Sequence, residues 1–386
     1  MKPGWKTIQM GQICTIQSGK SNTQDAAPDG PYAFFDRSKK PKRSNRYLYE
    51  CEALIIPGEG TQFLPTHFSG KFDLHQRAYA LFGFSEQIEI RFLFHYLHHM
   101  KDYFPRVAVG ATVKSLRQRH FEQLPVVLPP LAEQRRIVAF LDEAFAGIAT
   151  ARANAEKNLQ NARALFESHL NAVFTQRGEG WVEMRLGDKS ILEMIDGDRG
   201  PNYPQKSDFA DEGHCLFLNT KNVRPDGFDF TSRMFISESK DGTLRKGKLR
   251  REDVVLTTRG TIGNIALYSG DVPFENIRIN SGMLIFRPQK SRLSSAYLFE
   301  LFRSDIVKEQ IRLRTTGTAQ PQLPVKTLVD FIVPIPPTIA EQEAIVESQR
   351  ALGRETHRLE SIYQRKIAAL DELKKSVLHE AFSTGK

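Results

Sequence analysis

Apolar residues follow two different periods along this chain. Short apolar runs bounded by Gly and Pro, at 53–56, 78–84, 254–258 and 283–286, predict strands. A helical pattern follows at 86–103 and again at 294–312. Each helical stretch precedes an apolar run that closes in Pro-Pro, which neither sheet nor helix continues through. The pattern predicts two mixed α/β domains, each with a boundary at its Pro-Pro pair.

Beyond each Pro-Pro pair the apolar positions recur alternately three and four residues apart, which is typical of a coiled-coil seam. Adding 208 to every position of the first stripe gives the second stripe in the same register. Polar residues interrupt both stripes, and they either end the packed surface or fix its register. We expect two long helices with these apolar seam residues: Ile137, Leu141, Ile148, Leu165, Ile345, Leu352, Leu359, Leu370 and Leu373.

The globular parts repeat as well. Residues 52–61 align with 252–261 at an offset of 200, and residues 79–82 align with 283–286 at an offset of 204. Length differences between the copies concentrate early in each globular part, where loop-rich surface accepts insertions, so we expect specificity to reside there. The repeat predicts four segments: 1–130, 131–178, 179–337 and 338–386.

One motif joins each domain to its helix. Pro129-Pro130 is followed by Ala132-Glu133-Gln134, and Pro336-Pro337 is followed by Ala340-Glu341-Gln342. Thr338 and Glu341 form a capping box, whereas the first helix lacks one and has Pro130 for its first turn. The order of domain, motif and helix, written twice, resembles the specificity subunit of a Type I restriction-modification system.

This resemblance covers essentially the whole chain and implies a fold and a function. It implies two target recognition domains, each reading one half of a bipartite double-stranded DNA target, held apart by an antiparallel pair of helices. Two modification subunits and two restriction subunits are the implied partners, and S-adenosylmethionine, ATP and Mg²⁺ are implied for those partners, with no cofactor on this chain. Glu133, Gln134, Glu341, Gln342 and the seam residues are the implied docking positions.

Charge agrees with a polyanionic partner. The 386 residues carry a net charge of +9 and an isoelectric point near 9.3. Residues 1–130 hold 17 basic and 11 acidic side chains, whereas residues 340–386 hold 8 of each, so the excess lies mainly outside the helices. Three separated cysteines exclude a disulfide scaffold, and no apolar run suits a membrane span or a signal peptide, so we expect a cytoplasmic protein.

Two basic runs are candidates for contact with the DNA backbone. The first contains Arg37, Lys39, Lys40, Lys42, Arg43 and Arg46, and its alternative is a solvated loop. The second, at 245–251, contains Lys246 and Lys248, and its alternative is a charged strand edge.

Base reading requires Arg, Asn, Gln and Thr side chains in the grooves. Arg259 and Thr261 lie in a turn between two strand-like runs, for which a plain hairpin is the alternative. The segment 312–320 and its counterpart 106–114 follow helices and suit DNA-facing loops. The remaining predicted DNA-binding residues are Arg77, Arg106, Lys114, Arg117, Arg199, Asn202, Tyr203, Asn219, Lys221, Asn222, Arg312, Arg314, Thr316, Thr318 and Gln320.

Catalytic signals are weak. Gly19-Lys20-Ser21 lacks the earlier glycine of a phosphate-binding loop, because Cys14 occupies that position. His95, His98 and His99 have no histidine counterparts in the second copy, which favours a helix face over a metal site. We therefore expect a chain with no catalytic or metal-binding residues. A coiled-coil scaffold with basic domains, or a fragment of a fused restriction enzyme, are the alternative functions.

Overall fold

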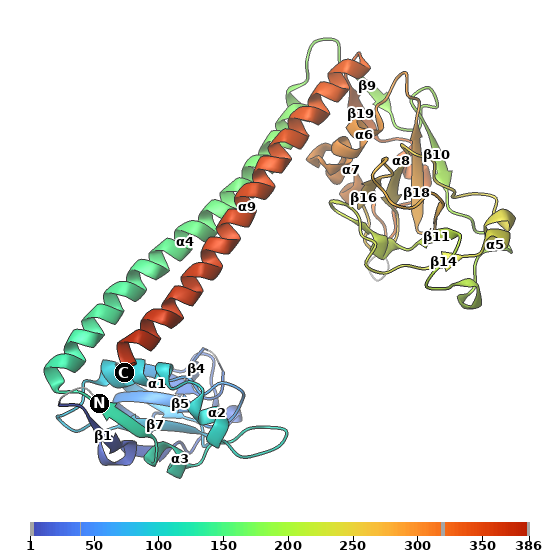
Figure 1. Cartoon of the computed structure of the whole chain (residues 1–386). Helices are drawn as coiled ribbons and strands as arrows, with labels where there is room; N and C mark the ends of the chain where they lie inside the picture. The colour runs from blue at the N-terminus through green and yellow to red at the C-terminus, as the bar shows by residue number, and fades with distance from the viewer. Residues whose placement is uncertain (1–3, 39, 318–320, 384–386) are drawn as a thin grey trace. The chain divides into compact units, whose positions relative to one another are not determined.

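The computed structural model describes residues 4–38, 40–317 and 321–383 (Figure 1). Two compact units make up the chain, Met1–Glu156 with Gln364–Lys386, and Lys157–Tyr363. Each unit combines one α/β domain with one segment of each long helix, α4 (Leu131–Gln176) and α9 (Ile339–Phe382). The expected mixed α/β class and the tandem arrangement of domain and helix are confirmed. No helix in these described ranges is long and apolar enough to cross a membrane.

The first domain contains a six-stranded sheet in the order β2-β7-β5-β6-β3-β4. All neighbours pair antiparallel except β3 with β6. Its strands are β2 (Thr15–Ser18), β3 (Tyr32–Phe35), β4 (Lys42–Ser44), β5 (Tyr49–Pro57), β6 (Thr66–Leu74) and β7 (Ala78–Phe82). A separate ladder joins β1 (Lys6–Gln9) to β8 (Pro125–Leu128), and the helices are α1 (Ile90–His99), α2 (Tyr103–Val107) and α3 (Gln118–Glu122).

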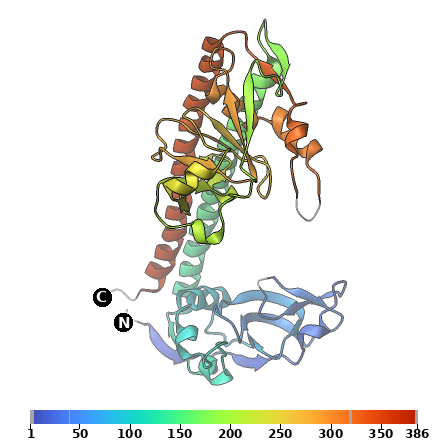
Figure 2. The same ribbon diagram turned by 90° about the vertical axis from the view of Figure 1, so that its right-hand side faces the viewer.

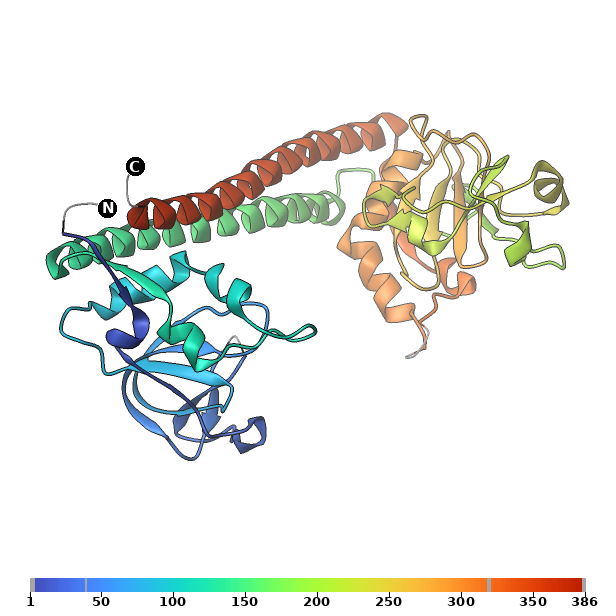
Figure 3. The same cartoon turned by 60° about the horizontal axis from the view of Figure 1, so that its bottom comes forward.

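Helix α1 lies between the sheet and the long helices of this unit (Figure 3). Its Phe92 and Leu97 share one core with Leu54 and Leu81 of the sheet and with Leu141 of α4, and all five side chains are fully buried. Burial of such side chains is worth about 1.5–3 kcal/mol each. The first turns of α4 therefore belong to the core of the first domain.

The second domain repeats this plan with shorter strands. A four-stranded sheet has the order β10-β18-β15-β16, a three-stranded sheet has the order β14-β11-β17, and two ladders pair β12 with β13 and β9 with β19. The strands are β9 (Val182–Arg185), β10 (Leu192–Asp196), β11 (Cys215–Leu218), β12 (Val223–Arg224), β13 (Gly227–Phe228), β14 (Phe235–Ile236), β15 (Val254–Thr257), β16 (Ile265–Leu267), β17 (Ile277–Ile279), β18 (Met283–Pro288) and β19 (Ile332–Ile335). The helices are α5 (Glu238–Thr243), α6 (Ser295–Arg303), α7 (Asp305–Arg314) and α8 (Val325–Leu328).

Strand register corrects one detail of the predicted repeat. Leu54 of β5 pairs with Leu81 of β7, and its counterpart Val254 of β15 pairs with Phe286 of β18. The offset of β18 from β7 is therefore 205, not the 204 expected from matching residues 79–82 to 283–286. Apolar identity at consecutive strand positions does not fix alignment, whereas hydrogen-bond register does.

Within each unit the segments of α4 and α9 run antiparallel and side by side (Figure 2). Arg152 contacts Asp371 at 2.9 Å in one unit, and Arg163 contacts Glu360 at 2.6 Å in the other. Glu341 N–H donates to Thr338 Oγ1 at 3.2 Å, which confirms the Thr338 half of the predicted capping box of the second helix.

The predicted seam is wrong at two of its positions. Leu165 and Leu373 are 61% and 48% exposed. Beyond the buried Ala155, the packed stripe of α4 continues through Leu159, Ala162, Phe166 and Leu170. Spacings of four, three, four and four approach the 3.6-residue period of a straight helix, so a strict heptad pattern leaves the packed face within two turns. The remaining predicted seam residues are buried or half-buried.

A buried glutamine joins each long helix to its domain. Gln134 Oε1 accepts from Glu89 N–H at 2.9 Å, while Gln134 Nε2 donates to the carbonyls of Gln87 at 2.8 Å and Pro129 at 2.9 Å. Gln342 makes the equivalent three contacts, with Ser294 N–H at 2.8 Å and with the carbonyls of Arg292 at 3.0 Å and Pro336 at 3.4 Å. We call these two residues the glutamine latches.

Each long helix also ends on the domain of its unit. Phe382, near the end of α9, packs 5.3 Å from the Phe92 ring of α1, and Phe174 of α4 packs 5.6 Å from the Tyr297 ring of α6. These pairs occupy equivalent repeat positions. Each domain is therefore anchored to the start of one long helix and to the end of the other.

We predict that Gln134→Leu and Gln342→Leu each lower the free energy of unfolding by about 2 kcal/mol, because each leaves a backbone N–H and carbonyls without partners. Gln349→Leu is the matched control. Gln349 is also buried, but both of its amide atoms lack a partner among the described residues, and its repeat counterpart is Leu141. Chemical unfolding followed by circular dichroism should show no loss, or a gain, for Gln349→Leu, and equal losses in all three variants would contradict the latch.

The three histidines of α1 face the long helices of the same unit. His95 Nε2 lies 3.3 Å from Asp142 Oδ1, and the His99 ring lies 5.4 Å from that of His379. Burial, together with the nearby His95 and Lys374, lowers the pKa of His98 to about 4. Within the described residues no group of three or more His, Cys, Asp or Glu side chains could hold a metal ion.

We predict acid destabilisation of the first unit from His98. Between about pH 6.5 and pH 4 the unfolded chain binds a proton at His98 that the folded chain does not. The free energy of unfolding should therefore fall by up to about 3 kcal/mol as the pH drops through this window. Unfolding at a series of pH values should show a smaller slope for His98→Gln, while the exposed His357→Gln variant keeps the wild-type slope.

Candidate nucleic-acid interface

The first predicted basic cluster is partly used within the fold. Lys42 Nζ lies 2.6 Å from Asp36 Oδ2, Arg43 donates to the carbonyls of Gly30 and Pro31, and Arg46 reaches Asp25 at 2.9 Å. Burial raises the pKa of Asp36, but hydrogen bonds from Lys42 and Ser38 outweigh it and hold this pKa below its usual value. Lys40 is exposed, and Lys39 lies outside the described residues. These contacts fix the position of the basic surface, and they leave Lys40 as its least constrained charge.

A polar pocket of about 240 Å³ opens beside this cluster. It lies where β3, β5 and β6 end and β7 begins, and two of its residues, Arg37 and Arg77, were predicted from the sequence. Arg77 forms an ion pair with Glu59, and Ser115 Oγ donates to Glu59 at 3.2 Å. The lining residues are Thr23, Asp36, Arg37, Glu59, His75, Gln76 and Arg77.

An exposed hairpin borders the same place. Val109 and Ser115 exchange backbone hydrogen bonds of 2.9 and 2.8 Å, and the residues between them are exposed, including Lys114. Arg106 and Arg117, just outside the hairpin, are exposed as well. In the second domain Thr316 and Gln322 exchange bonds of 2.9 and 2.8 Å in the same way. The predicted residues Thr318 and Gln320 lie between these two residues in the sequence and outside the described residues.

Several predicted residues of the second domain are structural. Asn222 is 1% exposed, and its amide donates to the carbonyls of Asp229 and Ser232, so the prediction that it reads bases is wrong. Tyr203 packs against Phe217 with ring centroids 5.8 Å apart. Asn219 caps a short helical turn, in which it accepts from Lys221 N–H at 2.8 Å.

Other predicted residues of this domain remain at the surface. Arg199 donates to the Ser281 carbonyl at 3.3 Å, and Asn202 donates to the Thr243 carbonyl at 3.4 Å. Lys221, Lys246, Arg259, Thr261 and Thr316 are exposed.

The second basic run rests on a buried ion pair. Arg278 and Asp241 are 7% and 6% exposed and contact each other directly, and Lys248 Nζ lies 2.7 Å from the same Asp241 carboxylate. Burial alone would raise the pKa of Asp241, but Lys248 and Arg278 hold it below its usual value. Lys248 is therefore tied to the fold, whereas the exposed Lys246 is available to a ligand.

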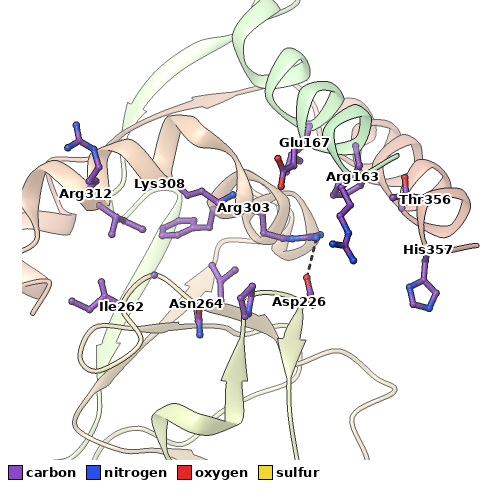
Figure 4. Close-up of a pocket in the computed structure, with 18 of the residues that line it drawn as sticks. Arg163, Glu167, Asp226, Ile262, Asn264, Arg303, Lys308, Arg312, Thr356 and His357 are labelled. Atoms are coloured by element: carbon purple, nitrogen blue, oxygen red, sulfur yellow. Dashed lines mark ion pairs between the residues drawn. The ribbon is translucent and has the colours of Figure 1, made fainter. Parts of the chain in front are cut away.

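A larger groove of about 770 Å³ lies between α7 and the long-helix segments of the same unit (Figure 4). Its charges are mixed and largely paired: Arg163 contacts Glu360, Arg303 reaches Asp226 at 3.9 Å, and Arg312 pairs with Glu309. Arg314, predicted for the same surface, lies over the Phe331 ring at 5.1 Å. Because these cations are already paired with carboxylates, the groove is not suited to bind the phosphates of a DNA backbone.

Some of the predicted docking residues are buried within the fold, and others remain at the surface. Gln134 and Gln342 are buried as latches, so their side chains are not free to contact another subunit. Glu133 pairs with Arg136 at 2.7 Å, and Glu341 is exposed. Leu165 and Leu373, outside the packed stripe, are exposed apolar residues at repeat-equivalent positions.

Sequence reasoning missed five residues of the polar pocket, namely Thr23, Asp36, Glu59, His75 and Gln76. One signal could have found Glu59, because the repeat aligns it with the predicted Arg259 at an offset of 200. The others follow strands, and only the sheet order brings those strand ends together.

The family model that describes the Type I restriction modification DNA specificity domain matches residues 2–159 and 178–368 of the chain. A specificity subunit of the Type I restriction enzyme EcoDI from Escherichia coli is 23% identical over 400 residues, covering 98% of this chain and 88% of that protein. The EcoBI specificity subunit from the same organism is 24% identical over 415 residues, covering 98% and 85%.

Solved structures share the fold. A chain from a structure that addresses complex assembly and conformational transition of the type I R-M system has a TM-score of 0.72 at 19% identity, with 100% of this chain and 99% of that chain covered. The HsdS subunit from Thermoanaerobacter tengcongensis has a TM-score of 0.60 at 19% identity, with 99% and 97% covered. With two matched domains in tandem, the chain belongs to the family of Type I restriction-modification DNA specificity subunits.

Proposed function

We propose that this chain reads a bipartite double-stranded DNA target, one half with each α/β domain, and directs its partner subunits to that target. One observation carries the proposal most directly. Both domains contain the same frame at a strand end, in which residue 59 bridges to Ser115 and residue 259 bridges to Gln322, but the side chains at residues 59 and 259 differ in chemistry. A shared frame with different surface chemistry suits two readers of two different half-sites.

Partner binding fits the long helices. Leu165 of α4 and Leu373 of α9 are related by the offset of 208, and both are exposed although apolar. Exposed leucines at equivalent positions favour two copies of one partner, and the modification subunit is that partner in our proposal. Two restriction subunits join the same complex.

The chemistry belongs to those partners. In this proposal the chain catalyses no step, the modification subunits use S-adenosylmethionine to methylate an adenine in each half-site, and the restriction subunits use ATP and Mg²⁺. This chain places the complex on its DNA target. Exposed Lys and Arg side chains bind phosphates, and groove-facing side chains bind bases.

We predict that exchange of residues 181–330 for those of another family member changes only one half of the target. Long-read detection of methylated adenines, in cells that carry the chain with its modification subunit, measures both halves at once. Deletion of the chain should remove the split motif. A change in both halves would contradict independent reading, and DNA binding without any sequence preference would favour a scaffold function instead.

We predict that Leu165→Gln and Leu373→Gln each remove one of two modification subunits, and that the double variant removes both. Neither change should alter the unfolding temperature, because these side chains are 61% and 48% exposed. Native mass spectrometry without DNA gives the count. Leu313→Gln is the matched control, because Leu313 is 65% exposed but lies on α7, and a similar loss with this variant would indicate a general effect of surface apolarity.

A further inference from the structure

Residues 59 and 259 occupy the same place in the two domains. Gly58 N–H donates to the Arg77 carbonyl at 2.7 Å, and Thr258 N–H donates to the Gly282 carbonyl at 2.8 Å. On the other side, the Gly58 carbonyl accepts from Leu116 N–H at 2.7 Å, and the Thr258 carbonyl accepts from Leu323 N–H at 2.9 Å.

The bridge partners of residues 59 and 259 are equivalent as well. Residue 59 bridges to Ser115, and residue 259 bridges to Gln322. Each of the two residues is thus held between the start of a strand, β7 or β18, and its bridge partner, Ser115 or Gln322. Backbone bonds on both sides fix its direction, so its side chain chemistry can change without a change in the frame.

The side chains at this place differ in charge. In the first domain Glu59 is 15% exposed and pairs with Arg77, which is 60% exposed. In the second domain Arg259 is exposed, and the position equivalent to Arg77 is Gly282. The side chain of Arg259 has no hydrogen bond or ion pair with the residues in the described ranges.

Neighbouring groups limit what replaces these side chains. A Cβ atom at Gly282 would lie 3.3 Å from both Thr220 Cγ2 and Asn280 Oδ1, so a second long side chain does not fit there without displacement of these groups. In the first domain a Cβ atom at Gly58 would lie 2.5 Å from the Arg77 carbonyl oxygen, so the strand end must approach β7 without a side chain. Local packing therefore disfavours a long side chain opposite Arg259 in the second domain.

These groups match the hydrogen-bonding pattern of base pairs in the major groove. A carboxylate accepts from the N4 amino group of cytosine, and a guanidinium donates to O6 and N7 of guanine. Glu59 and Arg77, side by side, offer an acceptor and a donor to the two bases of one C·G pair. Arg259 offers a donor to one guanine.

We infer that the residue at this equivalent place determines one base pair of each half-site: Glu59 with Arg77 reads a C·G pair in the first half-site, and Arg259 reads a guanine in the second. This inference rests on the proposed function. The bordering residues Lys114 and Arg117 supply contacts to phosphates, which set the register of the domain on the duplex.

The test uses the chain in complex with its modification subunit. Methylated motifs are mapped for wild type, Glu59→Gln, Arg77→Gln and Arg259→Gln, and binding is measured with duplexes in which each base pair of one half-site is changed in turn. We expect Glu59→Gln and Arg77→Gln to relax the same single position of one half-site, with a loss of discrimination of about tenfold or more. Arg259→Gln should relax a single position of the other half-site.

The matched control is Glu50→Gln. Glu50 of β5 pairs with Lys71 of β6 at 3.6 Å, at the opposite end of β5 from Glu59, and its loss should leave both half-sites unchanged. Circular dichroism of every variant checks that the domains remain folded. Wild-type discrimination at every position of the relevant half-site in the Glu59 and Arg77 variants, or an equal loss of affinity for all duplexes, would overturn the inference. A wild-type complex with no split motif would instead overturn the proposed function.

Discussion

The buried amide of the glutamine latch is the contact on which each domain depends for its connection to the helices. An amide both donates and accepts, so one side chain satisfies a backbone N–H and carbonyls on two separate segments. A carboxylate only accepts and an ammonium only donates, so neither could replace the whole set. Gln134 and Gln342 thereby tie the Pro-Pro turn, the start of a long helix and the loop before α1 or α6 into one arrangement.

Burial makes this contact specific. Both latch residues are at most 1% exposed, and an unmade hydrogen bond at such a site costs about 1–3 kcal/mol. Any rotation of the helix start against its domain would break three bonds at once. The rings of Phe382 and Phe174 hold the opposite helix through apolar contact, which tolerates small shifts that the latch does not. The amide hydrogen bonds therefore fix the orientation of each helix start against its domain, and the ring contacts add apolar stabilisation.

The sequence was sufficient for the domain order, the strands near 53–56 and 254–258 and the cap at Thr338, because each depends on local pattern or on repetition. It was insufficient for the seam beyond Ala155, where the packed face follows the period of a straight helix and leaves Leu165 in solvent. It also failed for Asn222, because an asparagine that caps a turn and one that reads a base look alike in a sequence. Only tertiary contacts distinguish them.

The charge of a residue in the sequence also does not show whether that charge is available to a ligand. A count of basic residues cannot separate Lys42, whose ammonium neutralises Asp36, from Lys40, whose charge faces solvent. The positive surface of the first domain is thus smaller than its composition implies, because contacts such as that of Lys42 with Asp36 hold part of its charge in fixed directions. Fixed direction matters for recognition, since a pre-organised side chain loses less entropy when it binds than a mobile one. Backbone hydrogen bonds fix the positions of residues 59 and 259, so these positions are suited to discriminate between bases as well as to attract DNA.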